Sequence, residues 1–491
     1  MRQFIGVMNR YELFLKSKKG LLVILLSVLL FNTFLYIKTE YKKIPDIQAR
    51  KDAAGFSHDK ANRFAYFFYY LGHYPLATIN TDLEYSKKGA EKEIDQRGED
   101  LIMEYMHWSR LGESARIFAY MPNAYIKGSP ENPSIKLFNA IIFTISLFIL
   151  FYGFWRIRKP LFGFLLLLLV NCTPFFIYEV YCHENIFGLM ASCFFIIVGL
   201  NIPVLFSRVN PFKYGVLAVF SGLLIGFFSE FRNEISVVIV SLLLLYTLST
   251  KIKIKTKIIF IFITIFFFNA SKTIIRDYFS LKFEKTIHLV GNNRGHIYNG
   301  PRLSGHNFWH PVFCGLGDFD TKYGYKWYDV IAYQYAIPIL QKDYGMQINY
   351  SGKYITDDYY DASKLYYKKP EELPNYEKVV KDKVIGDIKS DPLWFVTIII
   401  KRIFKALTTT IPVPYLGWLL VPLLYFLFKR KKWNFISLIL ISLPLSATSI
   451  LIHSGKGTTY NSLFLYFVLV IIFGLIYEYY YNNLEEPNSS K

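Results

Sequence analysis

Ten apolar stretches divide this chain into alternating hydrophobic and polar parts. Most of them are long enough to cross a hydrocarbon core, which takes about 20 helical residues. They are residues 21–37, 136–155, 161–178, 186–206, 214–229, 235–249, 258–273, 414–428, 434–452 and 461–478. The pattern predicts an all-α membrane protein, a polytopic helical bundle of about ten transmembrane helices.

The clustered Lys and Arg residues fall in every second polar segment. Short basic loops stay on the cytoplasmic side because translocating their charge is unfavourable, whereas long segments cross largely regardless of charge. The clusters lie in residues 2–19, 156–159, 208–213, 251–257 and 429–432. We therefore expect a multi-pass protein of the cytoplasmic (inner) membrane with both termini in the cytoplasm. The first span lacks a small-residue cleavage site, so we interpret it as a retained anchor.

This alternation predicts two large outer segments and no soluble domain. The expected parts are a cytoplasmic N-terminus (1–20), an anchor (21–37), outer segment one (38–135), a transmembrane core of spans two to seven (136–273), outer segment two (274–413), spans eight to ten (414–478) and a cytoplasmic tail (479–491). Candidate functional residues are therefore sought outside the cytoplasm.

Composition agrees with a membrane protein and narrows the partners. The chain is 53% hydrophobic and 19% aromatic, with a mean hydropathy of +0.26. Its net charge of +19 sits at span ends, where lipid headgroups and the insertion rule account for it, so no nucleic-acid partner is expected. Four scattered cysteines do not form a disulfide framework; Cys182 and Cys314 could pair outside or stay reduced.

Two amphipathic stretches are expected to lie on the bilayer as interfacial helices. Residues 60–76 are aromatic but interrupted by Gly72 and Pro75, and Tyr and Phe favour the headgroup boundary. Residues 392–410 must also lie outside, because a span there would export the basic 429–432 run. Lys401, Arg402 and Lys405 are then expected to face phosphates or solvent.

Acidic and basic residues gather in the outer segments and short outer loops. Outer segment one carries acidic side chains beside the first interfacial helix, and such a set offers a general base, although single surface carboxylates are usually inert. The loops YEVYCHEN and SEFRNE place charged groups at span ends, where they line a cavity or simply pair with one another. These residues are Asp46, Asp52, Asp59, Asp82, Glu84, Glu179, His183, Glu184, Glu230, Arg232 and Glu234.

This layout resembles that of the GT-C glycosyltransferases, and more narrowly the protein O-mannosyltransferase-like and aminoarabinose transferase-like branch. The resemblance rests on an anchor span, an acidic residue before an aromatic stretch ending in GHYP at 72–75, and Arg116 ahead of Pro122 before the second span. In that family an Asp of the first outer loop is the catalytic base. The resemblance therefore implies Asp59 as base, with Asp46 as the second candidate.

Further positions are similar to the family's later loops. The family's second outer loop commonly carries an acidic residue after a Pro-containing span end. Thr173-Pro174 followed by Glu179 and Glu184 is similar to this, and Glu184 matches best. The final outer loop offers Lys456 and Tyr460 where family members often carry an Arg-Tyr pair near the lipid phosphate. The family's adjacent acidic pair is absent here, because a lysine follows Asp59.

The implied activity is transfer of a sugar from a polyprenyl-phosphate donor to a glycan, lipid or protein acceptor. A base deprotonates the acceptor hydroxyl, and cations neutralise the departing phosphate. Glu184 would be a third catalytic candidate, orienting the acceptor or a divalent cation, the one cofactor considered. Arg232 and Lys456 would hold the lipid phosphate, and Arg63 and Arg116 are further substrate-binding candidates. No Walker or dinucleotide motif is present.

Residues 291–329 form the most unusual local sequence, rich in His, Trp, Arg and Gly. His306, Trp309 and His310 are candidates for recognising carbohydrate or pyrophosphate through stacking and hydrogen bonds. Zinc binding by His306 and His310 would need helical spacing, against which Pro311 and the nearby glycines argue. Plain loop packing is the third interpretation.

Two other functions remain open at this stage. An O-antigen-type polymerase or ligase also consumes lipid-linked saccharides, but would not be expected to enlarge the first outer segment. A transporter or flippase should show polar breaks at mid-membrane, whereas spans two to seven are charged only at their ends.

Overall fold

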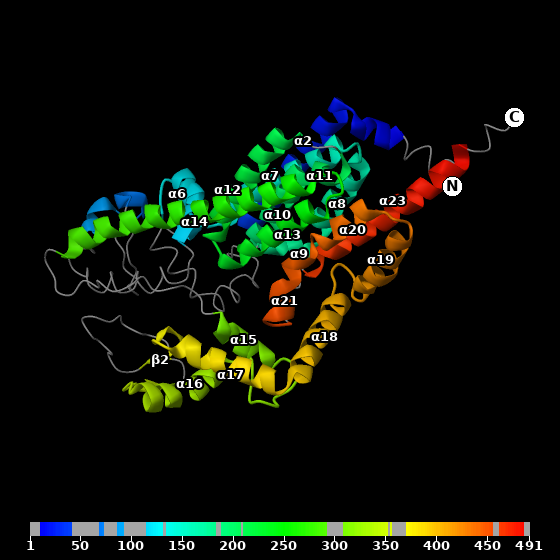
Figure 1. Cartoon of the computed structure of the whole chain (residues 1–491). Helices are drawn as coiled ribbons and strands as arrows, with labels where there is room; N and C mark the ends of the chain where they lie inside the picture. The colour runs from blue at the N-terminus through cyan, green and yellow to red at the C-terminus, as the bar shows by residue number, and fades with distance from the viewer. Residues whose placement is uncertain are drawn as a thin grey trace.

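A computed structural model describes most of the chain as an assembly of helices (Figure 1). The described residues are 10–41, 68–72, 86–92, 114–130, 134–182, 188–207, 210–291, 308–351, 354–355, 370–454 and 461–485. Within them the only strands are β1 (Tyr350–Ser351) and β2 (Tyr354–Ile355), a two-residue antiparallel pair. The predicted all-α fold is therefore confirmed.

The first half of the chain supplies most of the helical bundle. Its elements are α2 (Lys18–Tyr41), η1 (Ser114–Ala119), α6 (Met121–Lys127), α7 (Lys136–Arg156), α8 (Pro160–Cys172), α9 (Pro174–Ile177), the π-helical turn η2 (Tyr178–Cys182), α10 (Gly188–Asn201), α11 (Pro203–Phe206), α12 (Pro211–Ser229), η3 (Asn233–Val237), α13 (Val238–Leu248) and α14 (Ile254–Gly291).

The second half adds a polar module and returns to the bundle. Its elements are α15 (Trp309–Leu316), α16 (Asp329–Tyr344), η4 (Pro370–Glu372), α17 (Tyr376–Ser390), α18 (Pro392–Thr408), η5 (Leu416–Leu419), α19 (Leu420–Lys429), α20 (Trp433–Leu440), η6 (Leu443–Ser446), α21 (Ala447–Leu451) and α23 (Leu463–Glu485). We call residues 308–391 the polar module; in Figure 1 it lies apart from the bundle, and α18 joins the two.

Six helices of the described chain are long and apolar enough to cross a membrane. They are Lys18–Thr39, Lys136–Arg156, Gly188–Phe206, Pro211–Ser229, Ile254–Phe279 and Trp433–Leu451. The other four predicted spans coincide with shorter apolar helices, Pro160–Cys172, Asn233–Leu248, Leu416–Lys429 and Leu463–Tyr479. A multi-pass membrane protein is thus supported, while ten spans remain a prediction.

Glycine allows the closest helix contacts in the bundle. A Cβ on Gly153 of α7 would lie 2.2 Å from the carbonyl oxygen of Gly199 on α10. On α12, a Cβ on Gly222 or Gly226 would lie 2.6 or 2.5 Å from a carbonyl oxygen of α14. Association inside a membrane depends on close packing because lipid is as apolar as the helices, and small residues four apart allow that packing.

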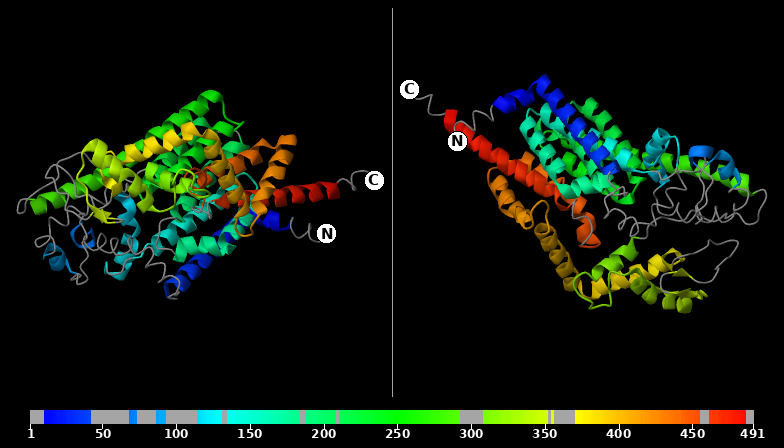
Figure 2. Two further views of the ribbon diagram at one scale, coloured as in Figure 1. Left: turned by 90° about the horizontal axis from the view of Figure 1, so that it is seen from below. Right: turned by 180° about the vertical axis from the view of Figure 1, so that it is seen from behind.

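The first and last described helical residues lie at one end of the bundle, as Figures 1 and 2 show. The Tyr477 hydroxyl of α23 donates to Glu12, and Glu478 pairs with Lys159 after α7 at 3.3 Å. The basic residues 156–159 therefore lie at the same end as both termini, as the charge pattern predicts for cytoplasmic loops.

Helix α14 is longer than the span that the sequence predicts. It continues without a break past residue 273 to Gly291, for 38 residues or about 57 Å at 1.5 Å per residue. A bilayer core is about 30 Å thick, so this helix is longer than a membrane span requires. Predicted outer segment two therefore begins as a continuation of span seven.

Candidate functional site

Helix α15 forms where the sequence argued against a helix, so that prediction was wrong. Pro311 is the third residue of α15, in the first turn, where backbone N–H groups have no partner within the helix and a proline costs little. The Glu377 carboxylate accepts hydrogen bonds from the N–H groups of Trp309 and His310, at 3.0 and 3.2 Å. This carboxylate satisfies the unpaired N–H groups of the first turn and lies at the positive end of the helix dipole.

The helix brings His310 into a cluster of polar side chains. Its Nδ1 lies 2.7 Å from the hydroxyl oxygen of Tyr376. Its Nε2 lies 3.3 Å from carboxylate oxygens of both Asp329 and Glu371, and 3.8 Å from Sγ of Cys314. These groups come from α15, α16, η4 and α17, so the cluster joins every helical part of the polar module.

The surroundings of His310 favour a positive charge. Burial lowers the pKa of the imidazole, but its contacts with Asp329 and Cys314 and the charge of Glu371 outweigh burial and raise the pKa to about 10. Among the described residues, His310, Cys314 and Asp329 are the one group of His, Cys and acidic side chains close enough to share a metal ion. Cys314 is a free thiol, in agreement with the reduced alternative.

A second buried centre lies just after α15, around Asp318. The Asp318 carboxylate accepts hydrogen bonds from Nε of Arg402 at 3.1 Å and from the N–H of Ser454 at 2.8 Å, and it lies 2.9 Å from Nε2 of His453. Burial raises the pKa of Asp318, but these hydrogen bonds and the charges of His453 and Arg402 outweigh it, so the pKa lies below its usual range.

Arg402 holds the module, α18 and the bundle together. Besides Asp318, its guanidinium donates to the carbonyl oxygens of Gly315 at 2.6 Å and of Ile450 at 3.0 Å. The residue is 1% exposed. The prediction that Arg402 faces phosphates or solvent was therefore wrong, because two acceptors at the end of α15 and one on α21 surround it. Lys401 and Lys405 are exposed, as expected, and Lys405 also donates to the Ser454 hydroxyl.

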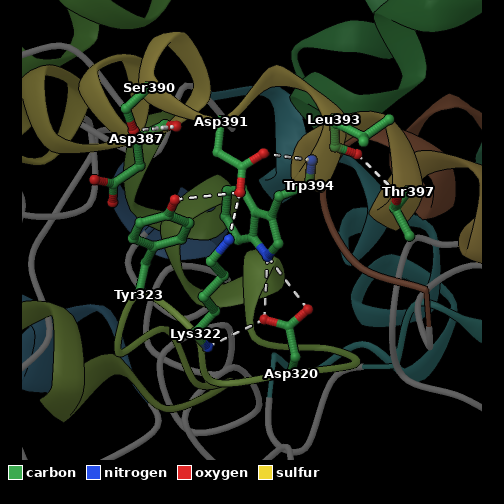
Figure 3. A network of polar contacts seen from close by, with 9 residues as sticks. All are labelled: Asp320, Lys322, Tyr323, Asp387, Ser390, Asp391, Leu393, Trp394 and Thr397. Atoms are coloured by element: carbon green, nitrogen blue, oxygen red, sulfur yellow. Dashed lines mark hydrogen bonds and ion pairs between the residues drawn. The ribbon is translucent and has the colours of Figure 1, made fainter.

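A third network fixes the corner between α17 and α18 (Figure 3). Asp391 caps α18 by accepting from the N–H of Trp394, and also accepts from Lys322 and Tyr323. The Trp394 indole donates to Asp320 at 3.1 Å. The loop after α15 thus sets the direction in which α18 leaves the module.

α18 has the two faces expected of a helix on a membrane surface. Its buried side includes Trp394, Ile398 and Arg402, whereas the apolar residues of its other side are exposed. The exposed ones are Leu393, Val396, Ile400, Ile403 and Phe404. They recur at helical spacing and leave an apolar stripe. Its position at a bilayer surface remains a prediction.

A cation-rich turn lies where α12 meets α14. The Glu230 carboxylate is fully buried and pairs with Arg276 at 3.2 Å and Lys272 at 3.8 Å, both on α14. Arg232 pairs with Glu234 at 2.8 Å. Among the described residues, three cations therefore surround two carboxylates at this turn.

The end of outer segment one packs on this turn. The N–H of Ala115 in η1 donates to the carbonyl oxygen of Glu230 at 3.0 Å. The Phe118 ring packs against Phe227 of α12 and Phe279 of α14, with centroids 6.4 and 5.2 Å apart. Of the predicted interfacial helix 60–76, residues 68–72 are described, and 68–71 are helical. The ring of Phe68 packs against that of Phe118, with centroids 6.5 Å apart.

The structure places five of the predicted site residues. Arg116 is in η1 beside the cation-rich turn, Arg232 is in that turn, and Trp309 and His310 begin α15. Glu179 lies half-buried in η2, whose Tyr181 bonds to Asn32 of α2. The remaining candidates lie outside the described residues: Asp46, Asp59, Arg63, Glu184, His306, Lys456 and Tyr460.

Sequence reasoning missed the residues that complete these centres. Asp318, Arg402 and His453 are far apart in the chain. Lys272 lies near the end of the predicted span 258–273. The available signal was a charged residue in or beside an apolar stretch, which is costly in a membrane unless it has a partner. Comparisons with protein-family models, curated proteins and solved structures found no match to this chain.

Proposed function

We propose that this chain is a membrane glycosyltransferase that transfers a sugar from a polyprenyl-phosphate donor to an acceptor on the exoplasmic side. The observation that carries the proposal is the cation-rich turn of Arg232, Lys272 and Arg276, with the end of outer segment one packed on it. A cationic group at the end of apolar helices suits a lipid phosphate, because the prenyl chain stays in the bilayer while the phosphate meets the cations.

The proposed reaction needs a base and a charged leaving group. The acceptor hydroxyl oxygen attacks the anomeric carbon, its proton passes to Asp59 or Asp46, and the sugar–phosphate bond breaks with its electrons on the phosphate oxygen. The cations then stabilise the charge that develops there. Both acidic candidates belong to the segment whose later residues pack on the turn. Glu184 would orient the acceptor.

Two further features support a lipid-linked substrate. The apolar stripe of α18 offers a surface for lipid, as an interfacial helix does. The Asp318 centre holds Ser454, two residues ahead of Lys456, so it restrains the start of the loop that carries Lys456 and Tyr460. That loop would supply the second set of groups for the phosphate.

Binding of the carrier tests the phosphate site without knowledge of the sugar. The full-length protein in nanodiscs is titrated with undecaprenyl phosphate and, for comparison, with uncharged undecaprenol. We expect Arg276→Gln to weaken binding of the phosphate roughly tenfold, the value of one charge-assisted hydrogen bond. Lys257→Gln, at the opposite end of the same helix, is the matched control and should bind as the wild type does. Equal affinity for the two lipids would refute the phosphate site.

Transfer itself is tested with a panel of polyprenyl-phosphate sugars that carry radiolabelled sugar. Membranes containing the wild type should release the free carrier and label an acceptor, and either Asp59→Asn or Asp46→Asn should abolish both. Full activity of both variants would remove the assignment of the base. Stepwise lengthening of a lipid-linked saccharide would instead identify a polymerase, and movement of the intact donor across the bilayer a flippase.

A further inference from the structure

We propose that His310, Cys314, Asp329 and Glu371 bind a divalent transition-metal ion, for which Zn²⁺ is the best match, and that this ion holds the polar module together. The four side chains come from α15, α16 and η4. The inference does not depend on the proposed glycosyltransferase activity, because it concerns the folding of residues 308–391.

Nε2 of His310 lies close to the distances of a tetrahedral zinc site from each of the other three proposed ligands. With usual Zn–N, Zn–O and Zn–S distances, tetrahedral ligands lie about 3.3 Å apart for nitrogen and oxygen and about 3.6 Å apart for nitrogen and sulfur. Here Nε2 of His310 lies 3.3 Å from Asp329, 3.3 Å from Glu371 and 3.8 Å from Cys314. The atoms of His310, Cys314 and Asp329 all lie within 4.8 Å of one another. Because separations within this group reach beyond the tetrahedral spacing, binding of an ion would draw the side chains up to about 1 Å closer together.

Helix α15 presents two of the ligands in the required way. His310 and Cys314 are four residues apart, so they lie on the same face of the helix, one turn from each other. Both are buried, whereas the Asp329 side chain is 45% exposed. The ion therefore has a route from solvent on the side of Asp329 and the half-buried Glu371, while His310 and Cys314 are shielded from water.

The surrounding side chains support the ligands as those of a metal centre do. A metal-binding histidine uses its second ring nitrogen for a hydrogen bond that fixes the ring, and here Nδ1 of His310 meets the Tyr376 hydroxyl at 2.7 Å. Tyr333 donates to Glu371 at 3.1 Å and stacks on the imidazole with centroids 5.5 Å apart. Tyr333 and Tyr376 are both fully buried.

The donor set selects the metal. Thiolate and imidazole ligands favour Zn²⁺ and neighbouring transition metals, whereas Mg²⁺ and Ca²⁺ prefer oxygen ligands alone. Four protein ligands leave no open coordination position, which is the arrangement of structural sites. The ion would link α15 to α16 and η4, and the hydrogen bonds from α15 to Glu377 would add α17.

Metal analysis of the purified full-length protein provides the first test. We expect about one zinc per chain to remain after dialysis, and Cys314→Ser to lose it. Cys172→Ser, at an exposed cysteine outside the cluster, is the matched control and should keep the metal. Asp329→Asn changes the exposed ligand and is the second variant if Cys314→Ser does not fold. Wild-type protein that is folded but binds no zinc, even with zinc added, would overturn the proposal and leave a protonated His310 paired with Asp329 and Glu371.

Cobalt substitution shows directly whether the Cys314 sulfur binds the metal, which a role of Cys314 in packing alone would not produce. Co²⁺ bound to the wild type should show a sulfur-to-metal absorption band, and Cys314→Ser should remove it. Tyr376→Phe keeps all four ligands but removes the hydrogen bond to Nδ1, so we expect metal affinity to fall about 10- to 100-fold. Unchanged affinity in Tyr376→Phe together with an unchanged band in Cys314→Ser would place the metal elsewhere.

Discussion

Replacing Arg402 by methionine is the most direct test of how the polar module is attached. The change keeps the length of an apolar stem but removes all three hydrogen-bonding contacts of the guanidinium, to Asp318 and to the carbonyl oxygens of Gly315 and Ile450. The Asp318 side chain is 2% exposed and keeps His453 and Ser454 as partners, so its carboxylate loses one stabilising contact and retains two.

The expected cost follows from that arrangement. Removing one partner of a buried ion pair costs about 3–5 kcal/mol. Because Asp318 retains two partners, we expect the lower end, about 3 kcal/mol, which corresponds to roughly a 150-fold increase in local opening. The opening should be confined to the contact between α15, α18 and α21, since the bundle core does not involve Arg402.

Hydrogen exchange followed by mass spectrometry measures this local opening. Segments 309–318 and 447–454 should lose protection in Arg402→Met, while the α7 and α10 segments should not change. Lys401→Met is the matched control, because Lys401 is exposed and only faces the Phe319 ring at 5.8 Å. Protection of both segments within threefold of the wild type would refute the proposed role of Arg402.

Three further outcomes are expected. The pKa of Asp318 is lowered in the folded protein, so its carboxylate stabilises the fold at pH values above the ordinary pKa of Asp, and this stabilisation is lost as the pH falls through the folded-state pKa. The difference in unfolding temperature between the wild type and Asp318→Asn should therefore shrink towards acid pH. A difference that stays constant with pH would contradict this. Gly222→Val should lower the free energy of unfolding by about 1–3 kcal/mol or more, because the new valine side chain would meet the Thr264 carbonyl oxygen. Gly215→Ala should be tolerated, because the nearest neighbour of its new Cβ lies at 4.0 Å. Equal stability of the two variants would argue against the close contact at Gly222. Alkaline phosphatase fused after Gly128 should be active and fused after Lys431 inactive, and the reverse result would invert the predicted topology.

The hydrophobic pattern was sufficient to predict the helical bundle but not its polar contacts. Each predicted span coincides with a helix because a continuous apolar run has few other ways to satisfy its backbone in lipid. The extension of α14 was missed, since residues 274–291 are no longer apolar and hydropathy alone does not mark where a helix ends.

The site required long-range contacts that spacing does not contain. His310 stood out by composition, yet its partners Asp329 and Glu371 are 19 and 61 positions away, and only the fold of the module brings them together. Pro311 was weighed as a helix breaker although it lies in a first turn, where that rule does not apply.

The uninterrupted α14 sets how far from the lipid the following chain begins. Its apolar part ends at Phe279, and the remaining helix to Gly291 adds about 18 Å at 1.5 Å per residue. An α-helix resists bending, so in the proposed topology the end of α14 would lie beyond the lipid headgroups. The acceptor of the proposed reaction could then reach Lys272 and Arg276 from the aqueous side without having to be buried in the bilayer.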